Sequence, residues 1–229
     1  MNHTAPVEAV MFDMDGTLVN SRSAIVSSYH DASTQVLGAP RPSDEDEMEE
    51  ILKLRGSEAF PLIVGDDPDK LDAFRSAFQA AYAAHGATAD GFPGLVVALE
   101  RLTEMGILLG IATSKARARL DLDLERLGIA QYFGFTVSGD EVPHGKPAPD
   151  PIIAVAAGLG VAVENGLYVG DGENDIIAAH AAGMRAVGVG FGFHPEACQA
   201  ENPEYFVDSY EELVQVVESL RGTPAGPRA

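Results

Sequence analysis

The strongest constraint on this chain is a short apolar segment that ends in two closely spaced acids. Residues 7–12 are mostly apolar, and the segment has the length of a typical β-strand. A loop of sequence Asp-Met-Asp-Gly-Thr follows at once, from Asp13 to Thr17. This pattern predicts a buried strand that presents Asp13 and Asp15 at its carboxyl end.

The segment from residue 21 to residue 88 follows a helical period instead. Apolar side chains recur at helical spacing in two stretches of it. These are Ile25, Tyr29, Ala32 and Val36 in the first stretch, and Leu71, Phe74, Phe78 and Tyr82 in the second. We therefore expect this segment to be all-helical.

Strands and helices alternate after a cluster of turn residues at 90–94. We expect a helix at 95–104 and further strands at 107–112, 135–137, 167–170 and 186–189. Such alternation is typical of a parallel sheet that helices cover on both faces. The predicted fold class is α/β, a Rossmann-like parallel-sheet core with an inserted α-helical cap domain.

The expected domains follow from where the helical block interrupts the strands. Residues 1–20 plus 90–221 should form the α/β core, and residues 21–89 should form the helical cap. Residues 222–229 are rich in Gly and Pro and are expected to be a flexible tail.

Polar side chains also follow the later strands. They are Thr113 and Ser114 after the second strand, Lys146 after the third, and Asp171 and Asp175 after the fourth. Ligands of open parallel sheets bind beyond the carboxyl ends of the strands, so these residues should line one site. Two like charges about 4 Å apart repel by roughly 1 kcal/mol in water and about 4 kcal/mol at an effective dielectric constant of 20. The acids therefore require a cation or protonation, and their hard oxygen ligands favour Mg²⁺.

The charge of the chain limits its partners. The formal net charge is −20, whereas nucleic acids and anionic membranes are bound largely through Lys and Arg, so neither is an expected partner. A phosphorylated substrate would need local cations to offset this charge. Residues 1–6 lack a leader pattern, no apolar run approaches the roughly 18 residues of a membrane span, and Cys198 is the single cysteine. We therefore expect a cytoplasmic protein.

Four motifs occur in order along the chain. They are Asp-x-Asp-Gly-Thr from Asp13, the strand-ending Thr113, Lys-Pro-x-Pro from Lys146, and Gly-Asp-x-x-x-Asp ending at Asp175. Together they resemble the signatures of the haloacid dehalogenase-like hydrolases, most closely the phosphoglycolate phosphatase-like branch with its helical cap. The resemblance implies a Mg²⁺-dependent phosphatase that hydrolyses phosphoglycolate or a similar small phosphomonoester through an aspartyl-phosphate intermediate.

The resemblance also implies roles for the matched residues. Asp13 would attack phosphorus, and Asp15 would protonate the leaving oxygen and later deprotonate water. Thr113 would bind the phosphoryl oxygens, and Ser114 is a further candidate for substrate binding. Lys146 would neutralise charge on the nucleophile and on the transferring group.

The implied metal ligands are the Asp13 carboxylate, the Asp15 backbone carbonyl and Asp171, all around Mg²⁺. Asp175 would bond the waters of the metal or the nearby lysine. Asn174 could touch the phosphate or a metal water, or it could cap the start of the following helix.

Basic residues of the cap are candidates for binding the rest of the substrate. Lys53 and Arg55 stand in a predicted loop between cap helices, where members of the family place substrate-contacting residues. The alternative is a solvated basic pair that offsets the acidic run at residues 44–50, itself expected to be an exposed face. Lys115 could help to orient the phosphate, and His144 is expected to be a loop histidine.

Two other functions remain open. A mutase like β-phosphoglucomutase shares the fold and both acids of the first motif, but Ile25 stands where that family has a cap histidine. The second alternative is a non-catalytic, phosphate-binding regulatory member, although the set of catalytic residues is complete.

Two residues depart from the pattern of the branch. Asn20 stands where the branch usually has Asp, and Gly172 stands where it usually has Ser or Thr. Phosphoglycolate, sugar phosphates, nucleotides and pyrophosphate all remain candidate substrates, and the oligomeric state is not predicted.

Overall fold

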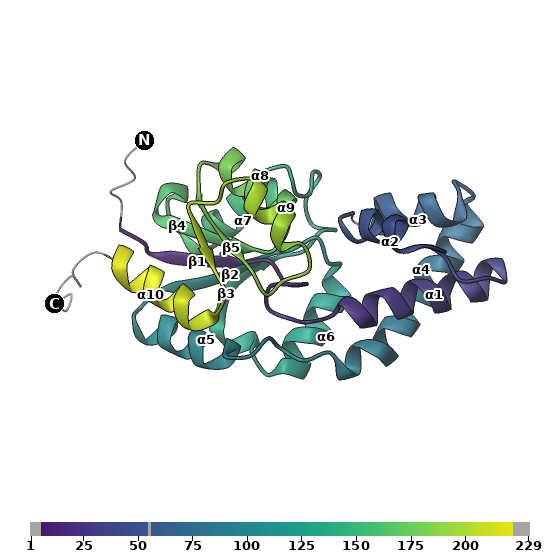
Figure 1. The fold of residues 1–229 in the computed structure, drawn as a ribbon, viewed down its shortest axis with the longest axis horizontal. Helices are drawn as coiled ribbons and strands as arrows, with labels where there is room; N and C mark the ends of the chain where they lie inside the picture. The colour runs from purple at the N-terminus through teal and green to yellow at the C-terminus, as the bar shows by residue number, and fades with distance from the viewer. Residues whose placement is uncertain (1–5, 55, 222–229) are drawn as a thin grey trace.

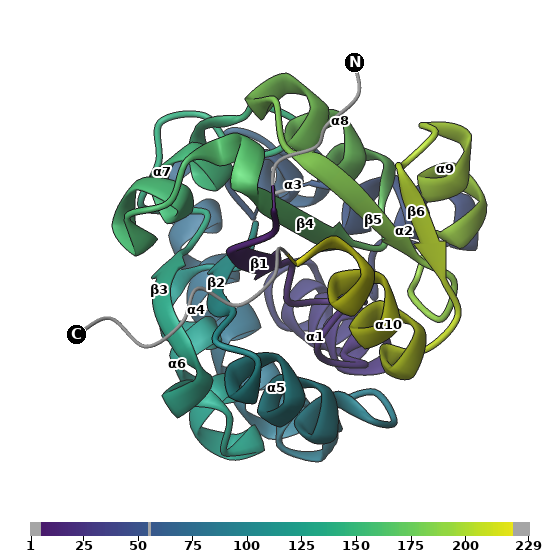
Figure 2. The same cartoon turned by 90° about the vertical axis from the view of Figure 1, so that its left-hand side faces the viewer.

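A six-stranded parallel sheet forms the centre of the protein (Figures 1 and 2). The structure is a computed structural model, and it describes residues 6–54 and 56–221. The strands are β1 (Ala9–Phe12), β2 (Leu108–Ala112), β3 (Phe133–Val137), β4 (Gly166–Gly170), β5 (Arg185–Val189) and β6 (Tyr205–Val207), in the spatial order β3-β2-β1-β4-β5-β6. The strand order reverses direction beside β1, which is where open α/β sheets bind their ligands.

Alternating side chains of β1 divide the core into two layers. Val10 and Phe12 point to one layer, while Ala9 and Met11 point to the other, as the period of a strand requires. The first layer packs against α5 (Leu95–Glu104), α6 (Arg117–Leu127) and α10 (Tyr210–Leu220), and the second packs against α7 (Asp150–Leu159) and α8 (Glu173–Ala182). Figure 2 shows α7 and α8 on one side of the sheet and α5 and α10 on the other. The strands are therefore buried on both faces.

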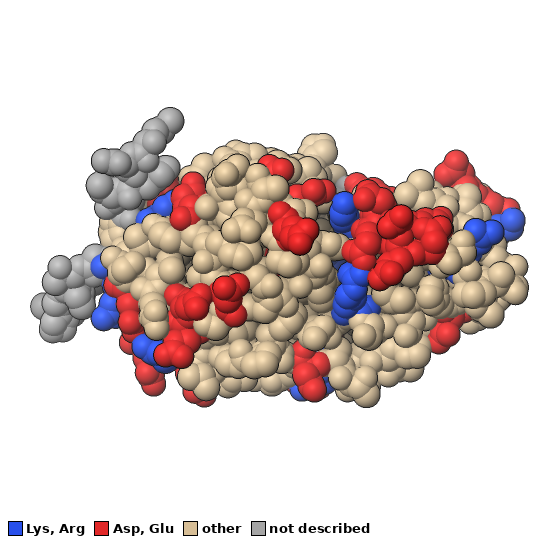
Figure 3. All heavy atoms as spheres, in the orientation of Figure 1, with Lys and Arg blue, Asp and Glu red and all other residues tan. Residues whose placement is uncertain are grey.

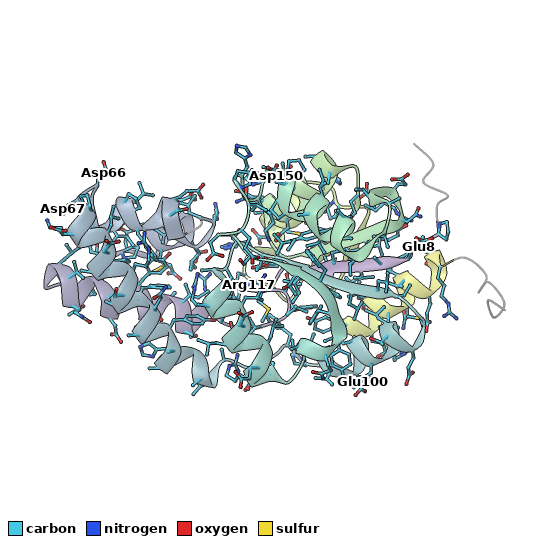
Figure 4. The ribbon with its side chains drawn as sticks, turned by 180° about the vertical axis from the view of Figure 1, so that it is seen from behind. Glu8, Asp66, Asp67, Glu100, Arg117 and Asp150 are labelled. Carbon is cyan, nitrogen blue, oxygen red and sulfur yellow. The ribbon has the colours of Figure 1, made fainter. Side chains whose placement is uncertain are left out.

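Helices fill the chain between β1 and β2. They are α1 (Arg22–Leu37), α2 (Glu45–Leu52), α3 (Gly56–Val64), α4 (Pro68–His85) and the short 3₁₀ helix η1 (Gly86–Thr88). Figure 1 shows this helical unit beside the end of the sheet, and Figure 4 labels Asp66 and Asp67 at its far tip. The predicted fold class, a parallel-sheet core with an inserted helical cap, is confirmed. The domain boundaries at residues 20, 89 and 221 stay predictions, and the predicted flexible tail lies outside the described residues.

An aromatic cluster holds the helical unit together. The rings of Tyr29, Phe60, Phe74 and Phe78 have centroids 4.7 to 6.5 Å apart and come from α1, α3 and α4. All four side chains are buried, and burial of each large apolar side chain contributes roughly 1.5–3 kcal/mol to folding. The helical spacing in the sequence thus marks the face along which α1 and α4 pack.

The remaining helices of the core are short. They are α9 (Pro195–Ala200), η2 (Ala130–Tyr132) and η3 (Val163–Asn165). The five predicted strands are confirmed, whereas β6 was missed because it has three residues, two of them only partly buried. Within the described residues, no helix combines the length and the apolar character that crossing a bilayer requires.

Candidate active site

The loop after β1 places Asp13 at the edge of the sheet. The Asp13 amide donates to the carbonyl of Val169 at 2.9 Å, which extends the pairing of β1 with β4. Gly16 then turns the chain with φ of +82°, a conformation that glycine adopts without strain. A Cβ at Gly16 would overlap the Asp171 carboxylate, so the glycine lets the β1 loop approach the end of β4.

Three buried carboxylates meet beyond the strand ends. Asp13, Asp171 and Asp175 each offer an oxygen, and these oxygens all lie within 4.8 Å of one another. The Lys146 ammonium lies 2.5 Å from Oδ1 of Asp13 and 2.6 Å from Oδ1 of Asp175. Thr113, at the end of β2, is 2% exposed and lines the same cavity. The structure therefore brings together residues from the ends of β1, β2 and β4 and from the loop after β3, as the sequence predicts.

Asp175 connects the lysine to the backbone of the following loop. Its Oδ2 accepts hydrogen bonds from the amides of Gly172 at 3.0 Å and Asp171 at 3.2 Å. Its Oδ1 accepts from Lys146, whose ammonium also lies 3.0 Å from the Tyr168 hydroxyl. This geometry fits the predicted position of Asp175 behind the reacting groups, because both of its oxygens are already engaged by the protein.

Burial and mutual repulsion raise the pKa values of these acids. Burial raises the pKa of Asp13 to about 6, with Asp175 and Asp15 adding to the shift and Lys146 opposing it. Burial and the charges of Asp175 and Asp13 raise the pKa of Asp171 well above its usual range. A single lysine thus faces three buried carboxylates, and their all-oxygen donors suit a hard divalent cation. The donor set therefore fits a divalent metal ion.

The Asp15 side chain turns away from the carboxylate cluster. Its Oδ1 lies 2.8 Å from the Lys115 ammonium and also accepts a hydrogen bond from the Ser21 hydroxyl. Burial alone would raise the pKa of Asp15, but the charges of Lys115 and Arg119 outweigh it and hold the pKa below its usual value. These contacts therefore fix the orientation of Asp15 beside Asp13 and favour its carboxylate form.

Lys115 belongs to a buried network that the sequence did not reveal. Its side chain is fully buried and its ammonium contacts Asp123 on α6 and, at 2.8 Å, the Tyr82 hydroxyl on α4. Tyr82 donates in turn to Asp123 at 2.8 Å. None of these partners is a candidate phosphate ligand, so Lys115 supports Asp15 and joins the helical unit to the core.

A few polar contacts join the helical unit to residues beside the site. The Asn174 amide donates to the backbone carbonyl of Lys53 at 3.3 Å, and the Lys53 ammonium lies 2.9 Å from Glu50 and 3.9 Å from Glu173. Gly172 precedes the first residue of α8, so Asn174 does not occupy the capping position that we considered for it. Arg55 lies outside the described residues.

A second contact between the units involves His194, in the loop after β5. Its Nδ1 lies 3.4 Å from Glu49 on α2, which also pairs with Arg22 on α1. Figure 3 shows the acidic patch of the helical unit beside basic side chains at this boundary, and the run at 44–50 is largely exposed, as predicted. His144 is exposed and pairs with Asp150 at 3.0 Å, which agrees with a loop histidine.

A cavity lies between the helical unit and the sheet edge. Its lining includes the catalytic candidates Asp13, Asp15, Thr113 and Lys146, together with Ser114. Its volume is about 110 Å³, which suits a small molecule. The cavity lining also includes residues that sequence reasoning did not select, among them Tyr29, Arg119, Phe193 and His194.

The order of the strands, the acids at the strand ends and the helical insertion are together typical of one class of hydrolases. The chain belongs to the haloacid dehalogenase-like hydrolases, whose family model matches residues 10–189. A phosphoglycolate phosphatase of Salmonella paratyphi A is 31% identical over 240 residues, covering 93% of this chain and 94% of the relative. The family resemblance inferred from the four motifs is thus confirmed.

Solved structures agree with this fold. A predicted phosphoglycolate phosphatase of Haemophilus somnus aligns with a TM-score of 0.80 and 24% identity, covering 92% of this chain and 97% of the other. A putative β-phosphoglucomutase of Thermotoga maritima aligns with a TM-score of 0.74 and 27% identity, covering 93% and 100%. Structures described as a predicted phosphatase and as a putative mutase thus share this architecture, which is compatible with both reactions.

Proposed function

We propose that this hydrolase is a Mg²⁺-dependent phosphatase that cleaves a small phosphomonoester, with phosphoglycolate as the first candidate. The observation that carries the proposal is the buried Asp13 carboxylate, held 2.5 Å from the Lys146 ammonium at the floor of a small cavity. The Salmonella relative supports phosphoglycolate, because it is similar to this chain over nearly its whole length.

In the proposed first step, an Asp13 oxygen forms a bond to phosphorus as the ester P–O bond breaks. Asp15 enters this step protonated and donates its proton to the leaving alkoxide oxygen, and it regains a proton from water in the second step; Lys146 offsets negative charge on the transferring group. Thr113 and Ser114 line the cavity beside Asp13, where they would bind the non-bridging phosphoryl oxygens. The product of this step is an alcohol and a phosphorylated Asp13.

In the second step, water attacks the phosphorus of the acyl phosphate. Asp15 takes the proton from this water, and inorganic phosphate leaves as the Asp13 carboxylate is regenerated. The contacts of Asp15 with Lys115 and Ser21 favour its carboxylate form, which this step requires. The same two contacts fix the direction in which Asp15 points.

Three groups of the protein would hold the metal. Asp13 and Asp171 supply carboxylate oxygens, and the Asp15 backbone carbonyl completes the protein ligands that we propose. Mg²⁺ bound there would neutralise charge on the phosphoryl group. Asp175 keeps Lys146 in place, and Asn174, which bonds the Lys53 carbonyl, positions the helical unit above the site.

Lys53 and Arg55 remain candidates for contacting the remote end of the substrate. Lys53 lines the cavity, although its ammonium is already paired with Glu50. The mutase alternative is not favoured, since the apolar Ile25 lines the cavity where the mutases carry a histidine. A cytoplasmic location and the lack of nucleic acid partners stay predictions from composition.

A phosphate-release screen tests this proposal. Purified protein with Mg²⁺ should release phosphate from a panel of small phosphomonoesters, and phosphoglycolate should rank among those with the highest kcat/KM. Pyrophosphate, a nucleotide monophosphate and a hexose phosphate serve as comparison substrates. Failure to release phosphate from any member of a broad panel, by protein that is folded by circular dichroism, would refute the proposed activity.

A further inference from the structure

Besides Ser114, two polar side chains in the cavity wall form no hydrogen bond or ion pair through their side chains with the described part of the chain. They are Arg119 on α6 and Tyr29 on α1, and both line the cavity that contains Asp13 and Asp15. Neither is used by the proposed mechanism. Polar groups that protein atoms leave unpaired in a binding cavity are available to a ligand.

Arg119 is held in place by aromatic rings. Its guanidinium carbon lies 5.1 Å from the ring centroid of Phe78 and 5.2 Å from that of Tyr82, both on α4. The side chain is half-buried, and across residues 6–54 and 56–221 it forms no ion pair within 4.0 Å. These ring contacts hold the guanidinium without using its N–H groups, which are left to bind an anion bidentately.

Tyr29 presents a hydroxyl at the same place. The residue is 4% exposed and its ring packs 4.7 Å from that of Phe78, yet its hydroxyl has no hydrogen bond to any described residue. The hydroxyl is near enough to Arg119 and Asp15 for both to act on its pKa, which burial raises to about 12. Tyr29 therefore stays protonated at neutral pH and can donate a hydrogen bond beside the Arg119 guanidinium.

The charges around Arg119 are already balanced without it. The two carboxylates nearby, Asp15 and Asp123, share Lys115, and Asp123 also pairs with Arg126 at 3.2 Å. Two acids thus face two basic residues, and Arg119, whose charge acts on Asp15 from beyond ion-pair distance, forms no ion pair with a carboxylate of the described residues. In a protein with a net charge of −20, an arginine without an ion pair at the cavity supplies local positive charge for an anion.

We propose that Arg119 and Tyr29 form a second anion subsite, which binds a carboxylate or second phosphoryl group of the substrate. The proposal rests on the proposed phosphatase function, since the first phosphoryl group is taken to lie at Asp13. The small cavity places both subsites within reach of one short molecule. The preferred substrates are then phosphomonoesters with a second acidic group a few atoms from the ester oxygen, and not neutral alkyl or sugar phosphates.

Two substrates of nearly equal size test the subsite. Phosphoglycolate and ethyl phosphate have the same two-carbon chain and differ in the carboxylate, so the ratio of their kcat/KM values reports its binding. Arg119→Ala should lower this ratio about 10- to 100-fold, chiefly through KM for phosphoglycolate, because hydrogen bonds to charged groups carry energies of this order. Tyr29→Phe, which removes the hydroxyl alone, should lower the ratio about 3- to 10-fold.

Matched variants separate binding from structure. Arg75→Ala removes an exposed arginine of α4 that pairs with Asp72, and it should leave the ratio unchanged. Arg119→Lys keeps the positive charge but not the planar guanidinium, so its ratio should lie between those of Arg119→Ala and the wild type. Melting curves of all variants identify any that fail to fold. If Arg119→Ala fails to fold, Tyr29→Phe provides the test.

The outcomes distinguish this inference from the function on which it rests. The subsite would be overturned if Arg119→Ala lowered kcat/KM equally for both substrates and Tyr29→Phe left the ratio unchanged. The proposed phosphatase activity would stand in that case. Wild-type protein that prefers ethyl phosphate would overturn the subsite as well. Absence of phosphate release from either substrate, and from the wider panel, would instead refute the phosphatase function itself.

Discussion

Asp13→Asn should abolish phosphate release from every substrate that the wild-type protein hydrolyses. An amide cannot form the acyl phosphate through the oxygen that attacks phosphorus, so the covalent route is lost. The expected fall in kcat is at least about 1,000-fold, in line with removal of a nucleophile from other enzymes. Initial rates with phosphoglycolate and with an aryl phosphate, both with Mg²⁺ present, measure the effect.

The control for this substitution is Glu8→Gln, which removes an exposed acid just before β1. Glu8 lies at the opposite end of the strand from Asp13 and is labelled in Figure 4. Its removal should leave kcat unchanged. Asp13→Asn removes one charge from a crowded buried cluster, so we do not expect it to unfold the protein. Activity of folded Asp13→Asn within tenfold of the wild type, an illustrative limit of about 1.4 kcal/mol, would exclude Asp13 as the nucleophile.

Asp171→Asn should remove the response of the protein to Mg²⁺. In the wild type, Mg²⁺ at about 100 times its Kd should add about 2.7 kcal/mol to the free energy of unfolding. For a chain of this size that corresponds to a rise in Tm of roughly 5–10 °C. The rise should be absent in Asp171→Asn, and kcat/KM should fall by about 100-fold or more, because the metal contributes several kcal/mol to the transition state.

Asp66→Asn is the matched control for the metal experiment, since Asp66 is exposed at the far tip of the helical unit (Figure 4). It should retain both the Mg²⁺-dependent rise in Tm and the activity. Ca²⁺ and Mn²⁺ in place of Mg²⁺ would establish which cation the site uses. An undiminished rise in Tm for Asp171→Asn would place the metal elsewhere and contradict the proposed ligand set.

Residues at strand ends are the part of the site that the sequence predicts well. Asp13 and Asp171 each follow a short apolar strand directly, and parallel strands bring their carboxyl ends to one edge. Hydrophobic period and turn residues therefore determine both the fold class and the convergence of these acids. Lys146 is positioned by the same logic, although its loop is longer.

The partners of Lys115 could not be predicted in this way. Its ammonium contacts Asp123 on the following helix, but also Asp15 and Tyr82, which are distant in sequence. Such a contact depends on how α4 and α6 cross, and no local pattern records that angle. In the sequence, the position of Lys115 beside the second motif suggested the phosphate instead.

Tyr29 and Arg119 were missed for a related reason. The helical period assigns Tyr29 to the buried face of α1, and its ring does pack there, but its hydroxyl reaches the cavity wall. Arg119 is one of several charged residues on α6, and the sequence gives no sign that the rings of α4 lie beneath it. Residues that select the substrate therefore emerge from the packing of the helical unit against the core.

One measurement tests directly whether a covalent phosphoryl intermediate forms on Asp13. Asp15→Asn should still be phosphorylated by an aryl phosphate, whose leaving group needs little protonation, but it should hydrolyse the intermediate slowly for lack of a base. Rapid acid quenching followed by peptide mass spectrometry should then find the mass of one phosphoryl group on the peptide that contains Asp13. Phosphate release by this variant without any such adduct, under conditions that trap one turnover, would contradict the mechanism.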